Sequence, residues 1–472
     1  MKLARALNEQ GVERIRAATG RILENTGLKI EHEAVRELLL EAGAKPGADS
    51  EIIRFPAEMV SEYLALAPAE VRLPGRTADC GVLGGGRNPV FWTAAAMNLA
   101  TAEGRREFER ADLARLARLV DSLPNIDGVV GVSLRDVPPK FRDVAGFREM
   151  IANTGKHVRI LSFTPRGVEA ILEMSAVVLD GESIADKPIF SMGFTAHGPL
   201  RWTNLALEIY STSAGHGIPV MVNGEPMAGG TGPVTLAGAA TVGNAEIIGG
   251  IVLNQVIEPG RPCIHNLGFA HVMDMRTGVA VTGAPENCLL AAAGAELARS
   301  YNLPSSSWIS SDSMLTDAQS AAEKTMAAIA HASAGVDLIW GVGTLESELC
   351  IGLGQVVLDD DIIGYVRRLL RGIEVSEETI AAELIEDVGH CGTFLDREHT
   401  MLNFQREIHE SPLFCRKQRE NWEADGAFPL QEVVEKRAEE LIESARPPSL
   451  SEEQTRELDR IEQKYFQLIT EG

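Results

Sequence analysis

Short apolar runs, each closed by glycine, proline or a polar residue, recur along most of the chain. The clearest are residues 188–194 and 218–222, and each is followed by a segment that reads as a helix. A strand shows a nearly continuous apolar run when helices cover the faces of a parallel sheet. The pattern therefore predicts an α/β fold, with functional groups in the loops after the strands.

The number and spacing of these runs indicate a TIM (β/α)8 barrel. Successive runs begin about 30 or about 45 residues apart, which suits a strand, a crossover helix and a return strand. An eighth strand is expected at residues 89–93 or 385–388. An open doubly wound sheet is the alternative, but no candidate strand is followed by a Gly-x-Gly-x-x-Gly turn. The five remaining runs are 128–134, 157–163, 261–268, 305–311 and 335–341.

Helical patterns flank the predicted barrel on both sides. We expect an N-terminal helical segment at residues 1–80, the barrel at 81–395 and a C-terminal helical extension at 396–472. Ser451 and Gln454 form a capping box that opens a final helix. One face of that helix carries Leu458, Ile461, Tyr465 and Leu468.

Composition excludes several classes of partner. The net charge of −23 at pH 7 argues against a nucleic-acid backbone or an anionic membrane surface. Six cysteines without a C-x-x-C pair suggest reduced thiols in a cytoplasmic protein, and the first residues lack an apolar signal core. The longest uncharged segment, 226–245, is interrupted by Gly, Pro, Thr and Asn, so we do not expect a membrane span.

Several segments in a fixed order resemble the trimethylamine methyltransferase family, whose members move a methyl group from an amine to a corrinoid protein. The carboxyl-terminal segment LIEDVGHCGTFLDREHTMLNFQREIHESPLF, residues 384–414, resembles the family's signature. The resemblance covers nearly the whole chain. It is carried further by RILENTGLKI and EAGA (within 21–44), APAEVRLPGR (67–76), ARLVDSLPNIDGV (117–129), GPVTLAGA (232–239) and NAEIIGGIVLNQVIEPG (244–260).

The resemblance implies a TIM barrel, a cognate corrinoid (cobalamin) protein as partner and a methylated amine as substrate. The chain lacks the D-x-H-x-x-G motif that places a His under cobalt, so we expect the corrinoid on the partner and none bound by this chain. It also lacks the pyrrolysine of the methanogen trimethylamine enzymes, and it looks closer to relatives that demethylate glycine betaine. A quaternary amine is therefore the expected donor, with trimethylamine or another tertiary amine as the alternative. A homo-oligomer is also expected.

A quaternary amine defines the kind of site to look for. When a nucleophile attacks one of its methyl groups, the nitrogen leaves as a neutral tertiary amine, so no general acid is required. Aromatic faces recognise a trimethylammonium group, each contributing ~0.5 to 2 kcal/mol, with a carboxylate nearby. A betaine carboxylate would need Arg, His or backbone N–H donors.

Two carboxylates are candidates for a catalytic role. Residues two apart share a face of a strand, so Trp308 and Asp312 are expected on one face, with Trp308 deeper and Asp312 at the mouth. Glu225 follows the run 218–222 and is expected to flank a cation. Capping a loop or helix is the alternative role for each carboxylate.

Further strand-end residues are expected to bind substrate. His265 and Phe269 are assigned to one face, as a carboxylate donor and a cage wall. Trp340 stands near the end of the run 335–341, and Glu346 follows that run. Phe194 ends the run 188–194. For each aromatic residue and for His265, a place in the core is the alternative.

A cluster near the carboxyl-terminal signature is the remaining candidate site. Asp387, His390, Cys391 and His399 suggest a metal, but the spacing H-C-x7-H fits no standard zinc template. No metal is expected. We instead assign His390 and Phe394 to the rim where the corrinoid protein docks.

Two other function classes stay open. A barrel lyase or aldolase would use a strand-end lysine as a Schiff base, and Lys156 and Lys187 stand at strand starts instead. A non-catalytic binding scaffold is the other alternative, which the polar strand ends disfavour.

Overall fold

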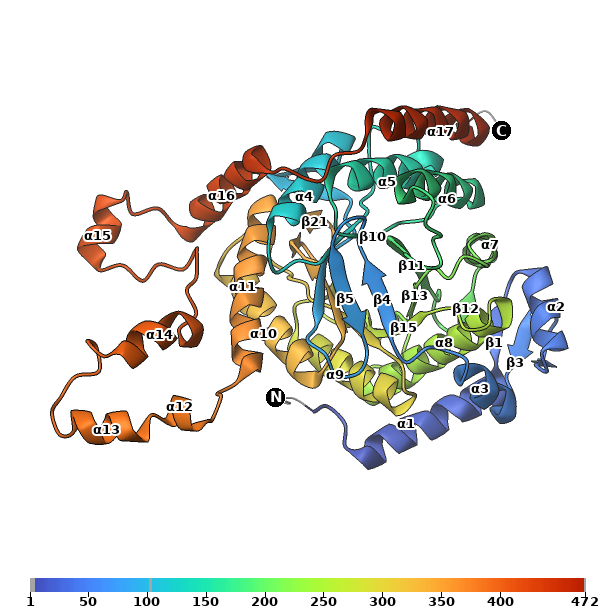
Figure 1. Ribbon diagram of the computed structural model, residues 1–472. Helices are drawn as coiled ribbons and strands as arrows, with labels where there is room; N and C mark the ends of the chain where they lie inside the picture. Colours follow the sequence, from blue (N-terminus) through green and yellow to red (C-terminus); the bar gives the residue numbers. More distant parts are fainter. Residues whose placement is uncertain (1–4, 102–103, 471–472) are drawn as a thin grey trace.

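A closed barrel of eight parallel strands forms the centre of the protein (Figure 1). In the computed structural model, which describes residues 5–101 and 104–470, every pair of neighbouring barrel strands is parallel. The predicted TIM barrel is confirmed. In barrel order the strands are β10 (His157–Arg159), β11 (Phe190–Thr195), β13 (Val220–Asn223), β15 (Cys263–Gly268), β18 (Ser305–Trp308), β19 (Leu338–Val342), β6 (Val90–Thr93) and β9 (Gly128–Val130).

A helix follows each barrel strand and lies on the outside of the barrel (Figure 1). The longest is α8, and 72% of its most apolar stretch is buried. Among the described residues it is the one helix apolar and long enough to cross a membrane, but its burial is that of a core helix. In chain order the helices are α4 (Arg110–Ser122), α5 (Arg142–Asn153), α6 (Pro165–Leu179), α7 (Asn204–Thr212), α8 (Leu236–Ile257), α9 (Pro285–Ser300), α10 (Ala318–Ala334) and α11 (Leu353–Arg371).

The amino-terminal segment contains helices, as the sequence predicted, together with short strands that were not expected. A four-stranded sheet joins it to the barrel, because β1 pairs in parallel with β12 from the loop after β11. These strands are only two or three residues long, which is too short for an alternation of apolar and polar residues to be recognised in the sequence. The helices are α1 (Glu9–Arg21), α2 (Glu33–Glu41) and α3 (Ala57–Leu64), and the strands are β1 (Leu28–Ile30), β2 (Lys45–Pro46), β3 (Ile52–Arg54) and β12 (Arg201–Trp202).

A hairpin closes the amino-terminal end of the barrel. It consists of β4 (Val71–Pro74) and β5 (Asp79–Leu83). Its buried side chains join the apolar cluster inside the barrel, and the Pro74 carbonyl lies 2.9 Å from Nδ1 of His157, the first residue of β10. The hairpin therefore covers the interior at this end of the barrel.

The chain beyond the barrel first forms an extended arm. The last barrel helix ends at Arg371, and residues 372–429 lead away from the barrel and back to it (Figure 1). None of the residues in the four arm helices is buried, and Leu395 is 83% exposed. The expected homo-oligomer stays a prediction. Exposed apolar side chains of the arm, such as Leu395, offer a surface for it. The arm helices are α12 (Glu377–Ile380), α13 (Ala382–Val388), α14 (Glu398–Glu407) and α15 (Arg419–Ala424).

Two final helices return to the outside of the barrel. α16 (Leu430–Ser444) lies against α11 and α4, and α17 (Glu452–Thr470) lies against α6. The capping box predicted at the start of α17 is present, with Ser451 N donating to Gln454 Oε1 at 3.0 Å and Gln454 N donating to Ser451 Oγ at 3.1 Å. Its buried face carries Leu458, Ile461, Tyr465 and Ile469, whereas the expected Leu468 is exposed.

A buried ion pair ties α10 and α11 to the end of β19. Lys324 Nζ lies 3.2 Å from Asp359 Oδ2, and both side chains are almost fully buried. The ammonium also donates to the Gly341 carbonyl at 2.6 Å and the Thr344 hydroxyl at 2.7 Å, while Asp359 accepts from Gly343 N at 2.7 Å. Burial lowers the pKa of Lys324, and the adjacent Asp359 opposes that shift. The pair fixes where the chain turns away from the barrel after β19.

Replacing Lys324 with Met should leave Asp359 as an unpaired buried charge. We expect the free energy of unfolding to fall by ~3 to 5 kcal/mol. The double variant Lys324→Met/Asp359→Asn removes that charge but keeps an acceptor for Gly343 N, so it should recover part of the loss. Urea or thermal unfolding measures both.

The matched control is Arg419→Met, which breaks an exposed pair with Glu423 and should change stability by less than ~0.5 kcal/mol. A double variant no more stable than Lys324→Met alone would mean that the charge of Asp359 is not the cause of the loss.

Candidate active site

A cavity of about 860 Å³ opens at the carboxyl-terminal end of the barrel. Its lining comes from all eight barrel strands or the loops that follow them. This is the end at which TIM barrels place their reactive groups. Its lining includes Met97, Arg159, Arg201, Glu225, Met227, Phe269, His271, Trp308, Trp340, Glu348 and Leu349.

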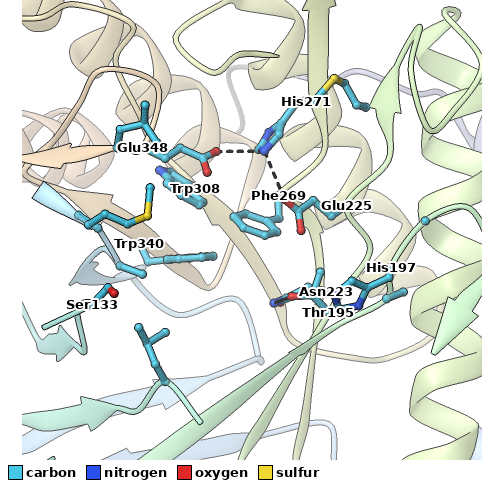
Figure 2. Close-up of a pocket in the computed structure, with 18 of the residues that line it drawn as sticks. Ser133, Thr195, His197, Asn223, Glu225, Phe269, His271, Trp308, Trp340 and Glu348 are labelled. Carbon is cyan, nitrogen blue, oxygen red and sulfur yellow. Dashed lines mark hydrogen bonds and ion pairs between the residues drawn. The ribbon is translucent and has the colours of Figure 1, made fainter. Parts of the chain in front are cut away.

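Three aromatic side chains form one wall of the cavity, which we call the aromatic wall (Figure 2). Phe269 stacks on Trp308 with ring centroids 4.8 Å apart, and Trp308 lies 4.5 Å from Trp340. The indole N–H groups of both tryptophans are buried, and neither has a hydrogen-bond acceptor among the described residues. Their electron-rich faces attract a cation, particularly where water is excluded.

A histidine between two glutamates lies beside this wall and forms what we call the charged cluster (Figure 2). His271 Nε2 is 3.0 Å from Glu348 Oε1 and 3.6 Å from Glu225 Oε1. Burial alone would lower the pKa of His271, but the two carboxylates outweigh it and raise that pKa to about 10. Burial raises the pKa of Glu348, although His271 opposes the rise. The cluster therefore holds two carboxyl groups to one imidazole.

An irregular turn after β19 brings Glu348 to the cavity. Glu346, Ser347 and Glu348 have φ of 52°, 49° and 83°, the left-handed region that non-glycine residues rarely adopt. Two backbone hydrogen bonds hold the turn: Glu346 N donates to the Ser313 carbonyl at 2.9 Å, and Ser347 N donates to the Ser311 carbonyl at 3.0 Å. Strain in the turn is therefore compensated by fixed contacts to the loop after β18.

Asp312 braces this turn and does not line the cavity. Its carboxylate accepts hydrogen bonds from Thr282 N, Thr282 Oγ1, Gly283 N and Ser347 Oγ at 2.6 to 3.0 Å. β18 ends at Trp308, so strand alternation does not extend to Asp312 and cannot place it at the mouth. The structure thus puts Asp312 behind Glu348, as a support for the turn.

Of the other residues chosen from the sequence, His265 and Phe194 face away from the cavity. His265 is buried against α8, with Nε2 2.9 Å from Asn244 Oδ1, and burial lowers its pKa to about 4. The register shifts between His265 and Gly268, so Phe269 turns inward although His265 faces out. The Phe194 ring lies 4.2 Å from that of Tyr210, outside the barrel.

The remaining sequence-based assignments also lie apart from the cavity. Glu346 pairs with Arg105 at the protein surface. His390 and Phe394 are exposed on the arm. Among the described residues, no three or more His, Cys, Asp and Glu side chains are grouped as metal ligands would be. The structure therefore brings together Glu225, Phe269, Trp308 and Trp340 from the sequence-based set.

Several charged residues of the cavity were missed by sequence reasoning, and three of them form the groups described here. Arg159 was visible as a charge inside the apolar run 157–163, and a charged residue in a buried strand is itself a signal. His271 stands two residues after Phe269, in β16 (His271–Asp274), where no periodic pattern marks it. Glu348 was missed in favour of Glu346, because the left-handed turn that directs Glu348 inward leaves no trace in the hydrophobic pattern.

Sequence comparison with known proteins points to one family. The trimethylamine methyltransferase (MTTB) family matches residues 1–466. The trimethylamine methyltransferase MttB of Desulfitobacterium hafniense (strain DSM 10664 / DCB-2) is 32% identical over 447 residues, 93% of this chain and 89% of the relative. The glycine betaine methyltransferase of Desulfitobacterium hafniense (strain Y51) is 30% identical over 454 residues, 95% and 94% of the two chains. The monomethylamine methyltransferase MtmB of Methanosarcina barkeri aligns with a TM-score of 0.47 and 13% identity, covering 99% and 96%.

The protonation of His271 can be tested directly. NMR of 13C-labelled histidine should show it as imidazolium at neutral pH, losing its proton only near pH 10. Because the folded-state pKa lies above the unfolded value of ~6.5, the resulting stabilisation is fully present below that value and is lost as pH rises through about 10. Glu348→Gln should lower the pKa of His271.

His265 is the internal control for this titration, since it should stay neutral down to about pH 4. A pKa of His271 near or below 6.5 would contradict the protonated state assigned to it.

Proposed function

The chain belongs to the trimethylamine methyltransferase family, and we propose that it transfers a methyl group from a quaternary amine to the Co(I) corrinoid of a separate partner protein. The observation that carries the choice of donor is the aromatic wall beside a charged cluster in which two glutamates face one histidine. A quaternary ammonium has no N–H to donate, so aromatic faces and an unneutralised carboxylate are the groups that can stabilise it.

The glycine betaine methyltransferase among the relatives supports this donor class. So does the absence of pyrrolysine from a chain of standard residues. Trimethylamine is the alternative donor, because other relatives carry that name. A Schiff-base lyase finds no support in the cavity, since none of its lining residues is a lysine, and Lys156 Nζ is held by three backbone carbonyls below it.

In this reaction the chain has to bind and orient the amine, and it does not have to transfer a proton. When the partner is docked, Co(I) of its corrinoid supplies the electron pair that displaces the amine from the methyl carbon. The C–N electrons remain on nitrogen, which leaves as a neutral tertiary amine and needs no proton. The aromatic wall holds the ammonium and keeps water from it, and the charged cluster offsets its charge until that charge disappears in the reaction.

The corrinoid must approach through the open end of the barrel, where the rim is apolar. Met97 and Leu349 line the cavity mouth and are 53% and 40% exposed. Met275 and Val234 lie beside Gly229, which stands between the cavity residues Met227 and Thr231 in sequence: a Cβ added at Gly229 would lie 3.1 Å from Met275 Sδ and 3.7 Å from Val234 Cγ2. Exposed apolar patches of this kind mark interaction sites. We propose this rim as the docking surface, with His390 and Phe394 on the arm as the alternative.

Removing an aromatic face should weaken catalysis without unfolding the protein. Trp308→Ala and Phe269→Ala are each expected to remove ~1 to 3 kcal/mol of transition-state stabilisation, which lowers kcat/KM for a quaternary amine roughly 5- to 150-fold. The assay follows cobalt methylation in the presence of the cognate corrinoid protein.

Phe194→Ala is the matched control, because this aromatic residue lies outside the cavity. It should cost ~3 to 5 kcal/mol of stability and leave kcat/KM per folded molecule unchanged. Fast methylation from trimethylamine, with none from any quaternary amine, would overturn the donor assignment and leave the family intact.

The docking surface can be tested with a charge on the rim. Met275→Asp should raise KM for the corrinoid protein about 10-fold or more and leave binding of the amine unchanged, because the side chain lies beside the mouth and not in it. The comparison is Phe394→Asp on the arm. If Phe394→Asp raises KM and Met275→Asp does not, the partner docks on the arm instead.

A further inference from the structure

A lone guanidinium lies inside the barrel at the cavity. Arg159 is the last residue of β10, and only 6% of it is exposed. Its Cζ is 5.3 Å from the centre of the Trp340 ring, which places the cation against the aromatic wall. Gly193 in the neighbouring strand leaves the space that the side chain occupies, since a Cβ there would overlap Nη2 of Arg159. The backbone is thus shaped to hold this cation.

The guanidinium has no hydrogen-bond or ion-pair partner among the residues that the structure describes. No carboxylate, carbonyl or hydroxyl accepts from it, and its Nε is buried and unpaired. Other buried cations have protein partners. Lys324 pairs with Asp359. Arg261 contacts the Ile218 carbonyl, Ser213 Oγ and Glu258. Burial lowers the pKa of Arg159 to about 10, so it remains charged at neutral pH. An unpaired buried charge of this kind calls for an anion from outside the chain.

The cavity therefore holds an acidic cluster and an unpaired cation. The charged cluster has two carboxyl groups to one imidazole, and Arg159 is a cation without a protein partner among the described residues. Between them lies the aromatic wall: Trp340 contacts Arg159, Phe269 lies 5.2 Å from Trp340, and His271 lies 5.5 Å from Phe269. A ligand that neutralises both ends must itself carry both signs. The unpaired indole N–H of Trp340 adds a second donor near the guanidinium.

We propose that Arg159 binds the anionic end of the methyl donor, a carboxylate, so that the substrate is a zwitterion with a quaternary ammonium at one end and a carboxylate at the other. This inference rests on the proposed function for the cationic end only. A planar guanidinium matches a carboxylate in a bidentate pair, and the pair is strong where water is excluded. Arg159 would then select among quaternary amines: those with a carboxylate bind, and those with a neutral tail do not.

Binding to this chain alone tests the inference without any corrinoid protein. Calorimetry should rank a trimethylammonium carboxylate well above its trimethylammonium alcohol analogue and above tetramethylammonium. Arg159→Gln should weaken binding of the zwitterion by roughly 30-fold or more, the range found when one partner of a buried charge pair is removed. It should change binding of tetramethylammonium by less than about 3-fold. Arg159→Lys keeps the charge but cannot form a bidentate pair with a carboxylate. Its affinity for the zwitterion should therefore lie between that of the unaltered protein and that of Arg159→Gln.

The matched control is Arg201→Gln. Arg201 also lines the cavity, but it is more exposed and already lies 3.6 Å from Glu31, so its loss should have little effect on the zwitterion. A thermal melt of each variant checks folding. If Arg159→Gln fails to fold, competition on the unaltered protein decides: a short aliphatic carboxylate without an ammonium should displace the zwitterion, and the corresponding alcohol should not.

The outcomes separate this inference from the proposed function. Equal affinity for the zwitterion and its alcohol analogue, or no competition by the simple carboxylate, would overturn the role of Arg159. If no quaternary amine binds but the simple carboxylate binds and is lost in Arg159→Gln, the anion site stands and the proposed donor fails.

Discussion

Charge removed from water is the constraint on which the interior of this barrel depends. A barrel of eight strands fills its centre with side chains, and a charged group buried in that centre or between the barrel and its helices must find a partner or lose its charge. Lys324 meets this requirement with Asp359, and His271 meets it with Glu348 and Glu225. Arg159 alone of these cations has no protein partner among the described residues. The exception lies in the cavity, where a ligand can supply what the chain does not.

The paired charges also determine where the cavity groups stand. The Lys324–Asp359 pair fixes the end of β19, and the chain then enters the left-handed turn of Glu346, Ser347 and Glu348. Asp312 holds that turn through Ser347 Oγ. These contacts support the turn from which Glu348 reaches His271. A carboxylate held on such a turn is preorganised, so it loses little freedom when a cation binds.

The sequence was a good guide where periodicity carries the information and a poor one where local backbone geometry does. Apolar runs located the barrel strands, because a strand buried on both faces must be apolar whatever its neighbours are. Alternation failed at two strand ends. A register shift turned Phe269 inward although His265 faces out, and the early end of β18 put Asp312 behind the site. The strands of the amino-terminal sheet were missed because two or three residues hold no period.

The arrangement of charge along the cavity suits the direction in which a methyl group must leave. Arg159 belongs to the strand itself and is deeply buried, whereas Glu225 and Glu348 stand on loops and are more exposed. In the proposed complex the carboxylate therefore lies deep and the ammonium lies toward the mouth. That orientation presents the methyl groups to the apolar rim at which we place the partner. Loss of the ammonium charge during transfer then leaves the charged cluster without its counter-charge, which weakens binding of the demethylated amine and favours its release.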